Sequence, residues 1–256
     1  MKHVFRESRF VFILFTLAVF AGCGGSPGAK PPAASTSAPP AAVPPNATMI
    51  PDIQKIPAWQ SCTACTGNPL GVYSMVEGVA SPSLSGSSAS FSLRPGTRPF
   101  GAALWFKYLT ADNEATHFVL DLDFYLQNPS APQAMEFAVS QSTGESRYNF
   151  AAQCDLANQR AWLVWSPAAG WISSGVPCVP PAAGSWNHLT WEFERDGSGH
   201  SIFKAVTLNG TRSEINISVP DARDSTSGID VSFQADATRT ATPYSVWLDK
   251  INLSYW

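Results

Sequence analysis

Three carboxylates occupy positions at which acid–base chemistry is possible. Asp121 and Asp123 alternate with apolar residues in the segment 118–126, so both should point to one face of a strand, together with Tyr125. Glu136 lies on the polar face of the next predicted strand, and we expect it to stand beside the two aspartates above one sheet. Paired carboxyls about 5 to 5.5 Å apart cleave glycosidic bonds. Recognition of sugar hydroxyls and a merely solvated sheet face are the alternatives.

Tryptophan is abundant in this chain, with nine residues, and four of them, Trp162, Trp165, Trp171 and Trp186, lie close together in the sequence. Indole rings stack on the apolar faces of sugar rings and retain an N–H for hydrogen bonding. Strand alternation places Trp162 and Trp165 on opposite faces, so at most one of this pair can line a groove. Trp162 and Trp186 join the three carboxylates and Tyr125 as predicted ligand-binding residues.

Cysteine usage indicates an oxidising compartment. Cys62, Cys65, Cys154 and Cys178 form an even set once Cys23 is set aside. Proximity in the sequence favours the pairs Cys62–Cys65 and Cys154–Cys178. A redox CxxC motif and a four-cysteine zinc site remain as alternatives, although no βαβ frame surrounds the CxxC and Cys154 and Cys178 lie far apart.

No pattern of cofactor ligands is found. Asp221, Asp224 and Asp230 share a Gly/Ser-rich loop that offers oxygens to calcium, but their spacing lacks the D-x-D-x-D-G arrangement. His117 and His188 lie on predicted strands, and no serine or cysteine nucleophile sits in a recognisable elbow. We therefore predict no metal and no cofactor, with calcium at this loop and zinc at the four cysteines as the alternatives.

Period-two alternation dominates the chain beyond residue 80, and helical periodicity is nearly absent. The Asn209-Gly210 dipeptide between two alternating runs predicts a hairpin that joins 202–208 to 212–219. So many short strands at steady spacing indicate a sandwich or barrel. The predicted strands are 89–93, 102–109, 118–126, 135–140, 148–152, 161–165, 186–195, 202–208, 214–219, 229–234 and 244–256.

The segment SWNHLTWEFER, the hairpin through TLNG and the last strand YSVWLDKINLSYW together resemble the concanavalin A-like lectin/glucanase superfamily of LamG-like jelly rolls. The resemblance covers about 81–256. It implies an all-β fold, a two-sheet antiparallel sandwich, with a concave face that binds or cleaves glycans. The E-x-D-x-x-E run of the glucanase branch is missing from this chain.

The amino terminus has the features of an export signal. Lys2, Arg6 and Arg9 precede an apolar run over 10–21, which is shorter than the roughly 20 residues that span a bilayer. The sequence VFAGC that follows resembles a lipobox, which implies cleavage before Cys23 and lipidation of that cysteine. Ordinary signal-peptidase cleavage is the alternative. Gly24 in place of Asp favours the outer membrane of a Gram-negative envelope.

The chain therefore divides into a signal peptide (1–22), a lipidated cysteine with a linker rich in Pro, Ala and Ser (23–51), and one β-sandwich (52–256). The part beyond the signal peptide carries 13 basic and 18 acidic residues and has no basic tract. Nucleic acid and anionic lipid head groups are thus poor partners. The expected partners are a polysaccharide and, through the anchor, a lipid membrane.

These observations favour a carbohydrate-binding lipoprotein anchored in the cell envelope. A glycan hydrolase or lyase that uses the carboxylates is the alternative, although enzymatic activity is not favoured in the absence of a catalytic motif. A structural or adhesive surface protein without a small ligand is the third hypothesis.

Substitution of Cys23 by Ala tests the lipobox. Without the thiol the acyl chains have no attachment point, so the protein should leave the membrane fraction or remain unprocessed. Fractionation with intact-mass measurement checks this, and Cys62→Ala serves as a control that keeps the lipidation site. A Cys23→Ala protein of normal mass that stays in the membrane fraction would contradict the assignment.

Overall fold

A computed structural model describes residues 42–67 and 69–256. The predicted signal peptide, Cys23 and most of the predicted linker lie outside these residues, so the export and lipidation assignments remain predictions. Within the described part of the chain, none of the helices has the length and apolar character needed to cross a membrane.

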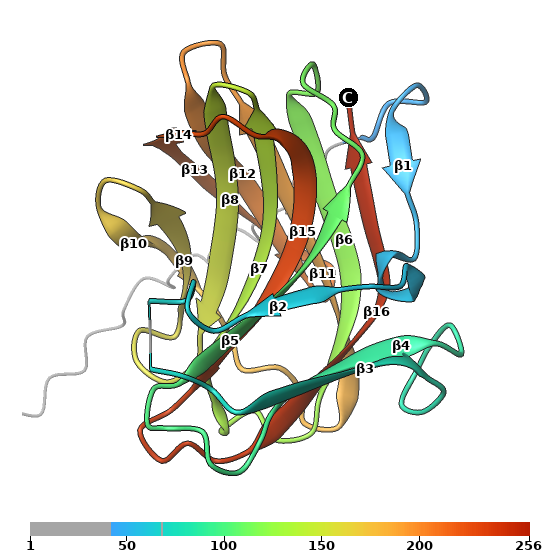
Figure 1. The fold of residues 1–256 in the computed structure, drawn as a ribbon, viewed down its shortest axis with the longest axis vertical. Helices are drawn as coiled ribbons and strands as arrows, with labels where there is room; N and C mark the ends of the chain where they lie inside the picture. Colours follow the sequence, from blue (N-terminus) through green and yellow to red (C-terminus); the bar gives the residue numbers. More distant parts are fainter. Residues whose placement is uncertain (1–41, 68) are drawn as a thin grey trace, which may run out of the picture. The chain divides into compact units, whose positions relative to one another are not determined.

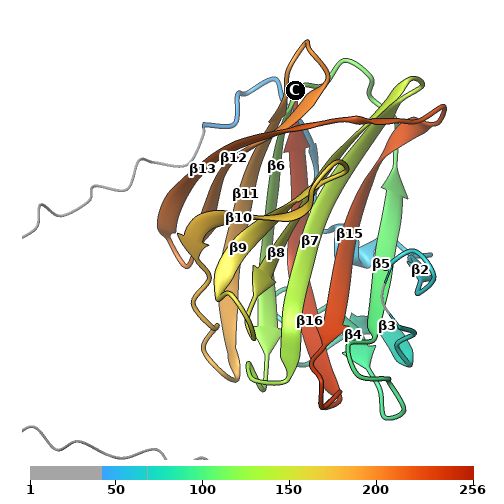
Figure 2. The same ribbon diagram turned by 90° about the vertical axis from the view of Figure 1, so that its left-hand side faces the viewer.

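The described chain forms two antiparallel sheets that face each other, which confirms the predicted all-β sandwich (Figures 1 and 2). The first sheet has the order β13-β12-β11-β6-β16-β4-β3, with β1 paired to β16. Its strands are β1 (Thr48–Ile50), β3 (Tyr73–Val79), β4 (Ser88–Leu93), β6 (His117–Leu126), β11 (Ser185–Arg195), β12 (His200–Leu208), β13 (Thr211–Pro220) and β16 (Tyr244–Tyr255).

The second sheet has the order β10-β9-β8-β7-β15-β5-β2, with β14 paired to β8. A single turn of 3-10 helix, η1 (Ile53–Lys55), precedes β2. The strands of this sheet are β2 (Gln60–Cys62), β5 (Ala102–Leu109), β7 (Pro132–Thr143), β8 (Ser146–Asp155), β9 (Ala161–Ser166), β10 (Gly170–Pro177), β14 (Ala222–Arg223) and β15 (Ser227–Ala237).

All the segments predicted to be strands are strands, and the strands that were not predicted are short or lie at edges. β3, β10 and β2 end their sheets, where a weaker alternation is tolerated because fewer neighbours contact each side chain. β1 lies in the segment assigned to the linker and pairs with Leu253–Tyr255 of β16. The Pro/Ala-rich composition ends before Thr48-Met49-Ile50, so the sandwich begins slightly earlier than predicted.

The core lies between the two sheets and is rich in aromatic residues. In β6 the alternation is as predicted, and Phe118, Leu120, Leu122, Phe124 and Leu126 are all buried. The aromatic pairs that join the sheets include Phe124 with Phe137, Phe150 with Phe193, and Trp162 with Trp191, with ring centroids 5.8, 5.2 and 5.2 Å apart. Such pairs each add about 0.5–1.5 kcal/mol beyond the area that they bury.

The predicted hairpin is also confirmed, since β12 and β13 pair across Asn209-Gly210. Both turn residues have positive φ, 49° and 80°. Asn and Gly tolerate this region, which a two-residue turn between twisted strands requires.

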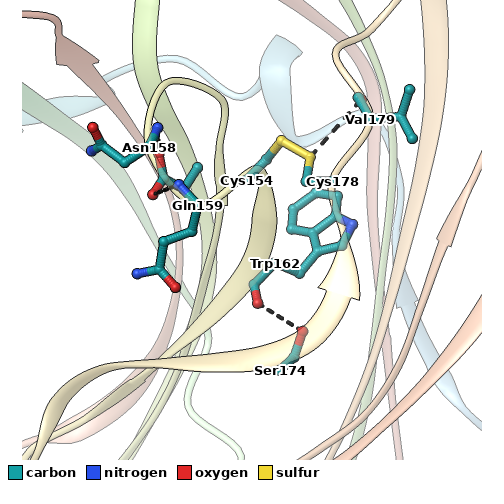
Figure 3. The surroundings of a disulfide bond; sticks show 8 residues. Cys154, Asn158, Gln159, Trp162, Ser174, Cys178 and Val179 are labelled. Atoms are coloured by element: carbon teal, nitrogen blue, oxygen red, sulfur yellow. Dashed lines mark hydrogen bonds between the residues drawn. A yellow bond between two sulfur atoms is a disulfide. The ribbon is translucent and has the colours of Figure 1, made fainter. Parts of the chain in front are cut away.

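The four cysteines form the predicted disulfides, Cys62–Cys65 and Cys154–Cys178, so the zinc alternative is wrong. A disulfide is also the oxidised form of a redox CxxC motif, so the redox alternative for Cys62 and Cys65 stays a prediction. Figure 3 shows Cys154 of β8 joined to Cys178, with the Trp162 ring beside the bond. The second disulfide spans 24 positions and encloses β9 and β10. In the chain-entropy model a loop of this length contributes about 3 kcal/mol.

Asp249 of β16 is a buried carboxylate that fixes the loop between β3 and β4. Its Oδ2 accepts hydrogen bonds from Ser83 Oγ and from the backbone N–H groups of Leu84 and Ser85, at 2.7, 2.6 and 2.9 Å. Gln54 Nε2 donates to Oδ1 at 3.1 Å. Burial would raise the pKa of this carboxyl, but these hydrogen bonds outweigh that effect and hold it at about 2.

Asp249→Ala should destabilise the sandwich by about 3 kcal/mol near neutral pH, because it leaves the buried Gln54 amide and several partly buried donors without an acceptor. The folded-state pKa lies below the unfolded one, so this contribution is present above about pH 4 and is lost as the pH falls towards 2. Urea unfolding at several pH values measures both effects. The exposed Glu145→Ala is the control, and equal stability of the wild type and Asp249→Ala at neutral pH would contradict the assignment.

Candidate functional site: a groove on the outer face of the second sheet

A groove of about 680 Å³ lies on the outer face of the second sheet. Its floor consists of side chains from β7, β8 and β15, the three neighbouring strands in the middle of this sheet (Figure 2). Because successive side chains of a strand point to opposite faces, the neighbours of the floor residues are core residues such as Phe137, Phe150 and Phe233.

The floor is polar at one end and lined by small residues in the middle. Gln153, Glu136 and Gln234 lie side by side in register on β8, β7 and β15. The next row along the strands has Ala151, Ala138 and Ser232 in the same order. Short side chains in this second row leave room above the sheet for a ligand.

Two carboxyls, Glu136 and Asp236, lie at the polar end. Asp236 follows Gln234 by two positions on β15, so it is the diagonal cross-strand neighbour of Glu136. Burial, followed by repulsion from Asp236, raises the pKa of Glu136 to about 8. Burial also raises the pKa of Asp236 to about 7, against a lowering effect of the hydrogen bond that Gln234 Nε2 donates at 3.0 Å. Near neutral pH this pair therefore holds at least one proton.

An ion pair occupies the opposite end of the floor. Arg147 Nη2 of β8 lies 2.9 Å from Asp230 Oδ1 of β15, and Arg147 Nη1 lies 3.9 Å from Asp224 Oδ2. Burial raises the pKa of Asp230, and Arg147 counteracts that shift in part. The guanidinium is thus already engaged by carboxylates of the protein.

Aromatic side chains stand on both sides of the groove. Trp165 of β9 and Trp171 of β10 pack edge to face, with centroids 5.3 Å apart. Phe106 and Tyr108 of β5 do the same at 5.2 Å. Tyr108 remains 58% exposed, so its ring is accessible to a ligand.

The predicted grouping of Asp121, Asp123 and Glu136 is wrong. β6, which carries the two aspartates and Tyr125, pairs with β11 and β16 in the first sheet. Glu136 lies on β7 in the second sheet. Strands that are consecutive in the chain belong to different sheets here, and alternation within one strand carries no information about that crossing.

On the outer face of the first sheet, the predicted residues mainly contact one another. Asp121 Oδ2 lies 2.9 Å from His188 Nε2 and accepts a hydrogen bond from Thr190 Oγ1 at 2.7 Å. Burial raises the pKa of Asp123, and His188 counteracts this shift. Tyr125 packs between Trp186 and Trp247, with both centroid distances 5.6 Å.

Trp162 does not line the groove, contrary to the prediction. Its side chain is 2% exposed and packs edge to face on Trp191 in the core. Trp165, three positions later, points to the groove. The predicted opposition of these two faces is correct, and only the choice between them was wrong.

Sequence reasoning missed Gln153, Gln234 and Asp236. A signal was available in β15, where Asp230, Ser232, Gln234 and Asp236 alternate with Ile229, Val231, Phe233 and Ala235. Such a run indicates a strand with one core face and one polar face.

Two of the three aspartates in the loop considered for calcium, Asp224 and Asp230, share Arg147 as their cationic partner. Asp230 faces Arg147 in the groove, Asp224 accepts hydrogen bonds from Ser142 and Thr226, and Asp221 lies beside Gly199. Over residues 42–67 and 69–256, no group of three or more His, Cys, Asp or Glu side chains is arranged to hold a metal ion.

A scan against protein-family models finds no match, and neither does a search of curated proteins. Solved structures with a similar strand arrangement include lectins and a glucanase. Arcelin-5, a lectin-like defence protein from Phaseolus vulgaris, is 10% identical with a TM-score of 0.46 over 82% of this chain and 98% of its own. Lectin I from Ulex europaeus is 10% identical with a TM-score of 0.45 over 81% and 98%.

The β-glucanase of Bacillus licheniformis is also 10% identical, with a TM-score of 0.44 over 81% of this chain and 97% of its own. The likeness to these proteins is one of strand arrangement.

The raised pKa values predict how stability depends on pH. Glu136 and Asp236 bind protons more tightly in the folded state, so their contribution is present below about pH 4 and declines as the pH rises through 7 to 8. Glu136→Gln should be as stable as the wild type near pH 4 and more stable near pH 9. One pKa unit corresponds to about 1.4 kcal/mol, so near pH 9 the free energy of unfolding of Glu136→Gln should exceed that of the wild type by at least this amount. Glu114→Gln, an exposed loop variant, is the control for urea unfolding, and parallel profiles of wild type and Glu136→Gln would contradict the shift.

Proposed function

We propose that this protein binds a glycan chain in the groove of the second sheet. The observation that carries the proposal is the combination of accessible aromatic rings on both sides with a polar floor between them. Sugar rings have apolar faces and a rim of hydroxyls, and the groove offers indole and phenol rings for the first and amides, carboxyls and hydroxyls for the second.

The polar floor groups are available to a ligand. The side chains of Gln153 and Ser232 are each 8% exposed, and neither forms a hydrogen bond with any residue that the structure describes. On the outer face of the first sheet, by contrast, Asp121, His188 and Thr190 already bond to one another. This difference favours the groove as the binding site.

The location of the protein is part of the proposal. We propose a lipoprotein anchored through Cys23 in the cell envelope, with the outer membrane as its destination. The charged and apolar segments before VFAGC and the glycine after the cysteine support this assignment. An anchored glycan-binding domain would hold polysaccharide at the cell surface or in the periplasm.

Cleavage of the bound glycan, by hydrolysis or by elimination, is a second candidate function. The neighbouring Glu136 and Asp236 favour it, because two carboxyls with raised and different pKa values can supply both an acid and a base near neutral pH. New reducing ends in incubations with a bound polysaccharide, absent with Glu136→Gln, would establish this activity.

Trp165→Ala should weaken glycan binding about five- to twelve-fold, since stacking on an aromatic ring contributes about 1 to 1.5 kcal/mol and each 1.4 kcal/mol is a factor of ten. A glycan array identifies the ligand, and calorimetry on the wild type and variant measures the change. Trp186→Ala, on the outer face of the first sheet, is the matched control and should keep its affinity. If Trp186→Ala lost binding and Trp165→Ala did not, the glycan site would lie on the first sheet instead. If no glycan on the array bound to the protein, the proposal would be refuted.

A further inference from the structure

The acidic end of the groove lacks a balancing cation. Among the described residues that line the groove, Arg147 alone is Lys, Arg or His, and it is engaged by Asp230 and Asp224 at the other end. Nothing cationic contributes to the electrostatics of Glu136 or Asp236, whose charged neighbours are acidic, and Asp155 adds to the repulsion on Asp236. Two neighbouring carboxyls are therefore left without a counter-charge inside the protein.

A second observation at the same place points to a ligand. Gln153, in register beside Glu136 on β8, is more than nine-tenths buried and lines the groove. Its amide forms no hydrogen bond with the described residues, and the same holds for the Ser232 hydroxyl one row further. Buried amides and hydroxyls are normally satisfied, so these groups are placed to bond something that enters the groove.

We infer that the glycan bound in this groove carries free amino groups, as in a polymer of β-linked glucosamine, and that an ammonium group sits between Glu136 and Asp236 while Gln153 bonds a neighbouring hydroxyl. The inference rests on the proposed function and specifies the class of glycan. Uronate polymers would bring carboxylates towards an acidic floor without a free cation. Neutral or N-acetylated sugars would leave the acid pair without its counter-charge.

The other groups of the groove agree with this class of ligand. An ammonium donates charge-assisted hydrogen bonds to carboxylates, which are about twice as strong as neutral ones. The tryptophans and Tyr108 on the sides also attract cations through their ring faces. The small residues Ala138 and Ala151 between them leave space for the sugar rings.

Binding of an ammonium should release protons. The carboxyls of Glu136 and Asp236 hold at least one proton near neutral pH, and a cation between them favours the ionised form. The remaining titratable groups that line the groove are Arg147, Asp230 and Tyr108, and Asp155 stands at the end of β8 next to the pair. Arg147 and Asp230 are already joined in an ion pair, so the released proton comes from the acid pair.

Calorimetry on the full-length protein with four hexasaccharides tests the inference: β-1,4-linked glucosamine, its N-acetylated form, cellohexaose and a galacturonate hexamer. The glucosamine hexamer should bind at least ten-fold more tightly than the other three. In two buffers of different ionisation enthalpy at about pH 5.5, where its amino groups are protonated before they bind, it alone should show net proton release. Glu136→Gln and Asp236→Asn should each weaken its binding ten-fold or more and reduce its preference over cellohexaose.

Glu114→Gln is the matched control, with the same change of charge outside the groove, and should bind as the wild type does. Equal affinity for the amino and neutral hexamers, or tighter binding of the galacturonate hexamer, would overturn the inference while leaving the proposed function intact. Spermidine carries ammonium groups without sugar rings. If it bound as tightly as the glucosamine hexamer, the inference that the ligand is a sugar would be overturned. Failure to bind any glycan on the array would refute the proposed function itself.

Discussion

Packing of aromatic side chains between the two sheets is the interaction on which the rest of this structure depends. Trp162 on Trp191, Phe150 on Phe193 and Phe124 on Phe137 hold the sheets together. Because side chains alternate along a strand, this packing also determines which residues face outward. The polar row of Gln153, Glu136 and Gln234 exists because Cys154, Phe137 and Phe233 next to them point to the core.

The outer faces of the two sheets differ in the hydrogen-bond partners of their polar side chains. On the first sheet, several polar groups bond to protein partners: Arg212 is bonded to Glu192, Thr190 to Asp121, and Asp249 to the loop that covers it. On the second sheet, floor groups of the groove remain without protein partners, and two carboxyls are buried at a cost that raises their pKa values. Strained electrostatics of this kind are typical of binding sites rather than of structural surfaces.

The disulfide between Cys154 and Cys178 connects the core to the groove. It encloses β9 and β10, which carry Trp165 and Trp171. β10 is an edge strand that pairs with β9 alone, so it has few contacts of its own. The covalent link to β8 limits its movement and keeps the two indole rings in place beside the floor. A side of the groove that is ordered before binding loses less conformational entropy when a ligand binds.

The sequence by itself determined the strands, the faces of β6, the hairpin at Asn209-Gly210 and both disulfide pairs, because each depends on residues near one another in the chain or on simple alternation. Only the tertiary structure decided that Glu136 lies in another sheet from Asp121 and Asp123, that Asp236 is its partner, and that Trp165 rather than Trp162 faces the groove. The physical reason is that alternation assigns a residue to one of two faces and does not say which sheet a strand joins or which face is covered. That choice depends on long-range pairing, such as β7 with β15 across some 90 residues of sequence, which no local pattern encodes.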